Sequence, residues 1–166
     1  RAFEGVNGDV LTFENITTLS NAPFQGISVT ELRFPNATTG GSRGLRYAYA
    51  DRFYIPNVKT AQGEFFQGST RVTHICMPSL TAITNVTSFF AGCTALTAFI
   101  LPGATMATIA GALALPTTST YVYVPANLLE TYKNATNWAT IADSILAIED
   151  SAEILQWLTD NGYEYE

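Results

Sequence analysis

His74 and Cys76, two positions apart, are the side chains of this chain best suited to nucleophilic chemistry. A neutral imidazole beside a thiol can activate the thiol as a nucleophile. His74 is the only histidine of the sequence, which excludes a metal site built from several histidines. Neither a third group that would orient the imidazole nor an oxyanion hole is evident. We therefore interpret His74 and Cys76 as neighbours on the surface of a sheet.

Two further groups of residues have a superficial likeness to ligand sites. Residues 40–44, Gly-Gly-Ser-Arg-Gly, lack the Lys-Ser/Thr pair of a P-loop, and we interpret them as a mobile insertion loop. Four carboxylates near the C-terminus lack the spacing of a calcium loop and are interpreted as a solvated acidic edge: Asp143, Glu149, Asp150 and Glu153. The sequence predicts no enzyme, no cofactor and no metal site.

The composition narrows the possible partners. The 166 residues carry 8 Lys and Arg against 14 Asp and Glu, a net charge of −6, which disfavours nucleic acid and anionic membrane surfaces. No apolar stretch reaches the ~18 residues of a membrane-spanning helix, so no membrane insertion is expected. Because the sequence begins at Arg1 and not at methionine, we expect a processed or excised piece of a longer chain.

The elements that would position these residues repeat along the chain. A short apolar phrase closed by a proline recurs every 21 to 24 residues. It occupies residues 31–35, 52–56, 74–78, 98–102 and 121–125, and residues 10–14 fit a sixth copy without the proline. A recurrence of this length is typical of a solenoid, in which each repeat contributes one rung.

Within each phrase the residues alternate between two faces, as in a β-strand. One face is apolar in every copy: Leu32, Phe34, Phe53, Ile55, Ile75, Met77, Phe99, Leu101, Val122 and Val124. The closing proline cannot donate a hydrogen bond to a neighbouring strand and ends each strand at the same height. We predict an α/β-type repeat solenoid whose rungs form a parallel sheet with one buried and one exposed face.

An aromatic residue two positions before a glycine precedes three of these strands: Phe24, Phe66 and Phe90. A glycine there suits a tight turn, and the ring is expected to fill the core. The third copy runs on as Phe-Phe-Ala-Gly-Cys-Thr-Ala-Leu-Thr-Ala-Phe-Ile-Leu-Pro. Residues 88–102, which contain this stretch, resemble the BspA-type leucine-rich repeats of bacterial surface proteins and phages.

The resemblance covers about residues 10–149 and implies leucine-rich-repeat-like rungs with irregular or short helical returns. It also implies a helical C-terminal cap over residues 121–149. Cys93 would be a buried thiol inside a turn, and Cys76 would point the other way, which argues against a disulfide between them. We divide the chain into a solenoid of residues 1–149, which includes the cap, and a helical tail of residues 150–166.

The tail has its own start and stop signals. Ser151 is suited to begin a helix, and Asn161-Gly162 to end it. Ile154, Trp157 and Leu158 would form one apolar face. Two alternatives stay open: this face folds back on the solenoid, or it meets a partner, including a second copy of the chain.

The exposed sheet face carries tyrosine and arginine, which are enriched at binding hot spots. The candidate binding residues are Arg33, Arg52, Tyr54, His74, Ile100, Tyr121 and Tyr123. We expect a non-enzymatic recognition or adhesion module that binds a host or bacterial surface protein or a glycan. With the family resemblance, this places it outside the cell, on a bacterial surface or a phage virion. The alternative is a structural spacer or self-assembling subunit of a virion or cell envelope.

Overall fold

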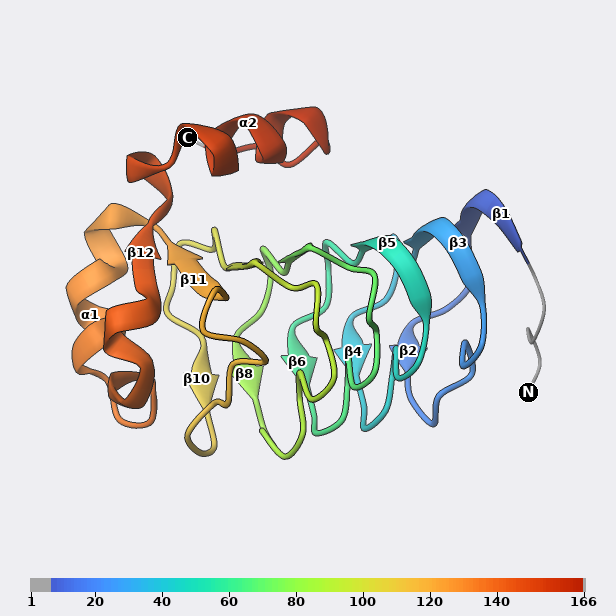
Figure 1. Ribbon diagram of the computed structural model, residues 1–166, viewed down its shortest axis with the longest axis horizontal. Coiled ribbons are helices and arrows are strands. Elements are labelled where there is room, and N and C mark those ends of the chain that lie inside the picture. The colour runs from blue at the N-terminus through green and yellow to red at the C-terminus, as the bar shows by residue number, and fades with distance from the viewer. Residues whose placement is uncertain (1–6, 166) are drawn as a thin grey trace.

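The computed structural model describes residues 7–165, which form an α/β protein with parallel sheets and a few short helices (Figure 1). The chain passes back and forth between two rows of strands. The first row holds β1 (Asn7–Thr12), β3 (Ser28–Arg33), β5 (Tyr49–Tyr54), β7 (His74–Cys76), β9 (Ala98–Ile100), β11 (Tyr121–Val124) and β12 (Ile145–Ala147). The second row holds β2 (Thr18–Leu19), β4 (Thr39–Gly40), β6 (Thr60–Ala61), β8 (Ala82–Ile83) and β10 (Thr108–Ile109).

The first row aligns the repeated phrases in register. Leu32 of β3 lies opposite Phe53 of β5, and Phe99 of β9 lies between Ile75 of β7 and Val122 of β11. All five side chains are at most 1% exposed. The ladder is interrupted between β5 and β7, so the row consists of two sheets, β1-β3-β5 and β7-β9-β11-β12. Within each sheet, the predicted stacking of the apolar face is confirmed.

The second row consists of two-residue strands that pair in the order β10-β8-β6-β4-β2. It incorporates part of residues 40–44, for which the prediction of an insertion loop is wrong. Gly40 belongs to β4, and Gly44 packs so closely that a Cβ there would lie 2.1 Å from the ring of Phe65. Glycine is required at this position because the ring fills the space that a side chain would need.

The three aromatic-glycine turns are built as predicted. Phe24, Phe66 and Phe90 are buried, and the glycines that follow them have φ angles of 84°, 73° and 78°. A Cβ on Gly68 would lie 2.1 Å from the ring of Tyr47, so both the backbone angle and the neighbour favour glycine. Large rings from successive turns therefore occupy the space between the two rows.

Both cysteines are buried free thiols. Cys93 lies in the third of these turns, and its Sγ donates a hydrogen bond to the carbonyl oxygen of Phe66 at 3.0 Å. Burial raises the pKa of Cys93 to about 12. The position expected for Cys93 is confirmed, and so is the expectation that Cys76 points the other way without a disulfide between them. Cys76 differs from the prediction only in being buried, and it is described with the binding surface.

Short helices close the C-terminal end of the core. They are the 3₁₀ helix Ala126–Leu128, α1 (Leu129–Asn134) and a second 3₁₀ segment, Trp138–Ser144. Tyr132 and Trp138 are each 1% exposed and meet edge to face, with ring centroids 5.1 Å apart. Both bind the backbone of Ala107, whose N–H donates to Tyr132 Oη and whose carbonyl accepts from Trp138 Nε1, each at 2.8 Å. These helices are thus held against the core by hydrogen bonds as well as by packing.

After β12, a 3₁₀ turn (Ile148–Asp150) leads into α2 (Ala152–Asp160), which lies across the first strand row (Figure 1). Ser151 Oγ accepts a hydrogen bond from the N–H of Ile154 at 3.3 Å, and the helix is followed by Gly162 with a φ of 72°. The predicted start and stop of the tail helix are confirmed. Within residues 7–165, no helix has the length and apolar character needed to cross a membrane.

Candidate binding surface

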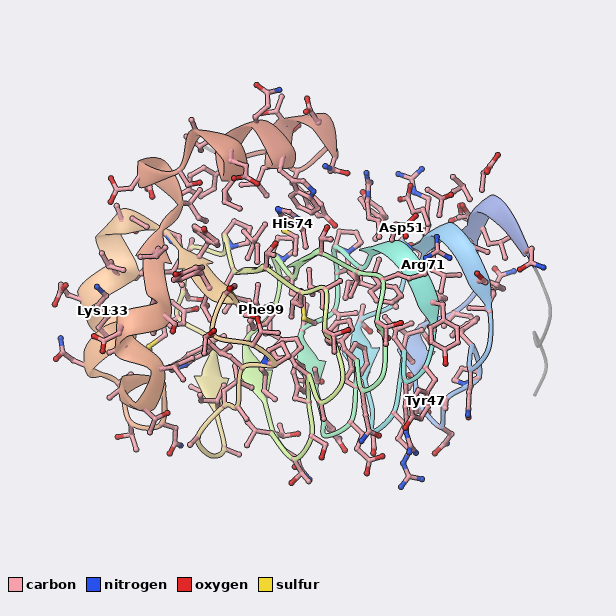
Figure 2. All side chains as sticks on the ribbon, viewed as in Figure 1. Tyr47, Asp51, Arg71, His74, Phe99 and Lys133 are labelled. Atoms are coloured by element: carbon pink, nitrogen blue, oxygen red, sulfur yellow. The ribbon has the colours of Figure 1, made fainter. Side chains whose placement is uncertain are left out.

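The outward face of the first strand row is the surface to which the sequence assigns ligand binding. The helix α2 lies across this face and divides the face into three parts (Figure 2). A covered centre consists of Cys76, Ala98 and Ile100. An arginine patch on the N-terminal side consists of Glu31, Arg33, Arg52 and Tyr54, and a tyrosine pocket on the C-terminal side is built around Tyr121 and Tyr123.

The covered centre corrects the sequence prediction. Cys76 and Ile100 were expected to face solvent, and this is wrong, because both side chains are fully buried. They form a second apolar cluster with Ile154 and Leu158 of α2. The alternation of a strand identifies the residues that point outward, but it does not tell what covers them. Ile100 is therefore out of reach of a ligand while α2 is in place.

The tail adopts the first of its two predicted alternatives and folds back on the sheet. Ile154 and Leu158 are 2% and 1% exposed, so neither is available to a second copy of the chain while α2 occupies this position. Trp157, the third residue of the apolar face, lies flat on the imidazole of His74, with ring centroids 5.0 Å apart and an angle of 12° between the planes. Figure 2 shows His74 directly beneath the helix.

A row of stacked rings joins the tail to the sheet. Trp157 stacks on Tyr163 at 5.8 Å, and Tyr163 meets Tyr54 of β5 at 5.7 Å. Next to this row, the guanidinium of Arg52 donates to the side-chain oxygen of Asn161 and, at 3.2 Å, to its backbone carbonyl. Tyr54 and Arg52 thus have structural partners in the tail, and their role in ligand binding is correspondingly restricted.

In the arginine patch, one carboxylate holds two guanidinium groups. Glu31 lies 3.0 Å from Arg33 Nε and 3.1 Å from Arg52, and its side chain is only 13% exposed. Arg33 also lies over the ring of Tyr54, 4.7 Å from the centroid. A pocket of about 270 Å³ opens beside Arg33 and Tyr54, with Glu14 on its wall. Because carboxylates balance the arginines, this patch is weakly charged and suits polar rather than strongly anionic ligands.

The tyrosine pocket is the part of the face that stays open between the sheet and the first turn of α2. Its volume is about 260 Å³. Its polar lining comes from three strands or their flanks and from the helix: His74, Thr97, Ser119, Tyr121, Tyr123 and Glu153. Ala98 and Ile154 add apolar wall. Tyr121 is 37% exposed, so its ring is presented to solvent beside a partly enclosed space.

Glu153 sets the electrostatic character of this pocket. Burial raises the pKa of Tyr123, and the neighbouring Glu153 carboxylate and Tyr121 raise it further. Tyr123 therefore stays protonated at neutral pH, and its hydroxyl can donate as well as accept hydrogen bonds. Burial lowers the pKa of His74, and Glu153 offsets part of this effect. The pocket thus combines the rings of His74, Tyr121 and Tyr123 with one carboxylate, that of Glu153.

The structure brings His74, Tyr121 and Tyr123 together as predicted, and adds residues that the sequence analysis did not single out for binding. Glu153, Ser119 and Thr97 belong to loops and to the tail, whose position relative to the strands is not fixed by the repeat. The carboxylate of Glu153 was assigned to an acidic edge. A signal for Glu153 was present in the sequence, because it directly precedes Ile154 of the apolar stripe. It therefore lies in the first turn of the helix that covers the outward face.

The nucleophilic chemistry that a Cys–His pair could in principle offer is not supported by the surroundings of either side chain. Burial raises the pKa of the Cys76 thiol well above its usual value, and the nearby Arg52 guanidinium only partly opposes this. Cys76 is therefore held as a thiol rather than as a nucleophilic thiolate. His74 Nδ1 lies 3.0 Å from Thr73 Oγ1. Over residues 7–165, no three His, Cys, Asp or Glu side chains gather as a metal site.

The burial of His74 predicts a pH dependence of stability. The folded state binds the proton of this imidazole less well than the unfolded chain, whose histidine titrates near the ordinary value of about 6.5. Stability is therefore fully present above about pH 6.5 and falls as the pH drops below it. We expect the loss between about pH 7.5 and pH 5.5 to be smaller in His74→Gln. Urea denaturation of both proteins at the two pH values measures it, and equal losses would contradict the prediction.

Comparison of the chain with models of protein families and with curated proteins finds no match. The family relationship therefore stays a resemblance, carried by the repeated phrase and the terminal segment of the sequence.

Proposed function

We propose that this chain is a non-enzymatic recognition module built as a BspA-like leucine-rich-repeat solenoid. The proposed solenoid is supported by the agreement between the sequence repeat and the pairing of the strands. Residues one repeat apart, such as Leu11, Leu32 and Phe53, lie opposite each other in parallel strands. A turn residue with a positive φ angle recurs at the same stage of four successive repeats, at Gly26, Tyr47, Gly68 and Gly92.

The observation that carries the recognition function is the tyrosine pocket. It places an exposed aromatic ring, Tyr121, beside a second tyrosine and several hydroxyl groups on a rigid sheet. Tyrosine supplies a large contact area at low conformational cost and a hydrogen-bonding hydroxyl. At about 260 Å³, the pocket suits one sugar residue of a glycan or one side chain of a protein. We place such a module on a bacterial cell surface or a phage virion, where the resembling family occurs.

The test is a screen of the protein against a glycan array and against surface proteins, followed by affinity measurements on two variants. Tyr121→Ala is expected to weaken binding by about tenfold or more. Thr39→Ala, an exposed position in the second strand row, is the matched control and should bind as the unaltered protein does. Equal binding by both variants would overturn the assignment of the pocket.

The rival function, a spacer or self-assembling subunit, makes a different prediction. Such a subunit should form a defined oligomer at micromolar concentration, and its assembly should be indifferent to Tyr121→Ala. Size-exclusion chromatography with light scattering measures this directly. A monomer that loses its ligand with Tyr121→Ala supports the recognition function, whereas a stable oligomer without any ligand supports the rival.

A further inference from the structure

The distribution of charge separates the tyrosine pocket from the rest of the molecule. Among the cationic side chains that the structure describes, the arginines are paired with carboxylates away from the pocket: Arg33 and Arg52 with Glu31, Arg43 and Arg46 with Glu64, and Arg71 with Asp51. Lys59 directly precedes β6 in the second row, and Lys133 lies on α1, at a distance from His74 in Figure 2. Among residues 7–165, no lysine or arginine lines the pocket.

Glu153 is the anionic group of the pocket. It stands in the first turn of α2 and is exposed on the pocket's rim. Within residues 7–165 it forms no ion pair, and the groups that sense its charge are His74 and Tyr123. A carboxylate without a cationic partner, in a chain whose net charge is −6, gives the pocket a negative potential. An anionic ligand, such as a phosphate or a carboxylate, is thereby disfavoured.

The remaining walls suit a cation that carries apolar groups. Tyr121 and Tyr123 are two positions apart on β11, so their rings leave the sheet on the same side. The faces of aromatic rings attract organic cations, and quaternary ammonium groups are bound by such rings in combination. Ala98 and Ile154 line the pocket but are only 1% and 2% exposed, so the apolar surface for methyl groups comes from the two tyrosine rings, and a strongly hydrated primary ammonium could not use it. Glu153 supplies the countercharge.

We propose that the tyrosine pocket binds a quaternary ammonium group, with Tyr121 and Tyr123 against its methyl groups and Glu153 as its counterion. The inference rests on the proposed recognition function and narrows its ligand to one that carries a choline-like headgroup. Its binding is non-covalent, and the ligand enters from the open side of the pocket beside Tyr121.

The experiment is a titration of the full chain with choline, in which binding is measured by the NMR signals of the tyrosine rings and by calorimetry. Choline is expected to bind saturably. Its neutral isostere 3,3-dimethylbutan-1-ol should bind about tenfold more weakly, and so should ethanolamine, which carries a primary ammonium. Equal affinity for the isostere would remove the role of charge, and equal affinity for ethanolamine would remove the role of the methyl groups; either result overturns the proposal.

Two carboxylate variants locate the site. Glu153→Gln keeps the size of the side chain and should weaken choline binding about tenfold. Asp150→Asn removes the same charge from a residue that does not line the pocket and should leave choline binding unchanged. Equal loss in both variants would show a diffuse charge effect and overturn the site. If choline does not bind while a glycan or protein ligand still depends on Tyr121, the ammonium specificity fails and the recognition function stands.

Discussion

Replacing Leu158 with aspartate is expected to make the Cys76 thiol react with a disulfide reagent on the order of a hundred times faster than in the unaltered protein. Leu158 is 1% exposed and shares an apolar cluster with Cys76 and Ile100. A carboxylate without a partner is strongly unfavourable in that cluster, so α2 should leave the sheet. Exposure then also removes the burial that holds the pKa of Cys76 high. The rate of thiol labelling without denaturant measures the effect.

The chain contains its own internal control, because Cys93 is its only other cysteine and lies in a turn away from α2. Leu158→Asp should therefore release one thiol and leave the other protected. Ala152→Asp adds the same charge to the same helix at an exposed position and should label as slowly as the unaltered protein. Unchanged labelling in Leu158→Asp would show that α2 does not protect Cys76. Equal labelling of both thiols would mean that the whole chain unfolds instead.

The buried face of the first strand row could be predicted because two regularities agree there. Alternation within each phrase identifies Leu32 and Phe34 as neighbours on one face, and the proline at a constant place fixes the register between phrases. A slip of one residue would expose every apolar side chain. The two-residue strands of the second row escaped prediction, because a segment such as Thr39–Gly40 is too short for any alternation to appear.

The outward face was harder to predict, although part of the signal was present. Its residues are charged or polar on β3 and β5, as in Glu31 and Arg52, but apart from His74 they are apolar on β7 and β9, as in Cys76 and Ile100. An apolar outward surface of this kind requires a cover. The tail offers a matching apolar stripe, but the sequence does not say whether that stripe meets this chain or another one. The packing of α2 decides the question and determines which tyrosines remain open.

The glycines of residues 40–44 illustrate a different limit. In the sequence they look like flexibility, because glycine is common in mobile loops. In the structure, position 44 requires glycine because the ring of Phe65, one repeat later, occupies the adjacent space. Such a requirement links residues that are distant in the sequence and depends on the packing of one sequence repeat against the next, so local patterns cannot reveal it.

Phe66→Ala is expected to be the most destabilising single substitution in the body of the protein, at about 3–5 kcal/mol in the free energy of unfolding. The Phe66 ring is fully buried and meets four others: Phe53, Phe65, Phe89 and Phe90, with centroids 4.7 to 5.8 Å apart. These rings come from three successive sequence repeats, so the neighbours cannot close the cavity without moving the strands and turns that carry them. Its backbone carbonyl also accepts the thiol hydrogen bond of Cys93, which ties the turn to the next one.

Urea denaturation at constant pH measures this loss, and Tyr121→Ala provides the comparison. The side chain of Tyr121, on β11, has a ring of similar size but is 37% exposed. Its truncation should lower the free energy of unfolding by less than about 1 kcal/mol. A loss below about 1 kcal/mol for Phe66→Ala would contradict the shared aromatic core. A small effect of Tyr121→Ala has a second consequence, because only a variant that keeps its stability can report on ligand binding. The two substitutions together therefore distinguish the rings that stabilise the core from the exposed ring to which we propose ligand binding.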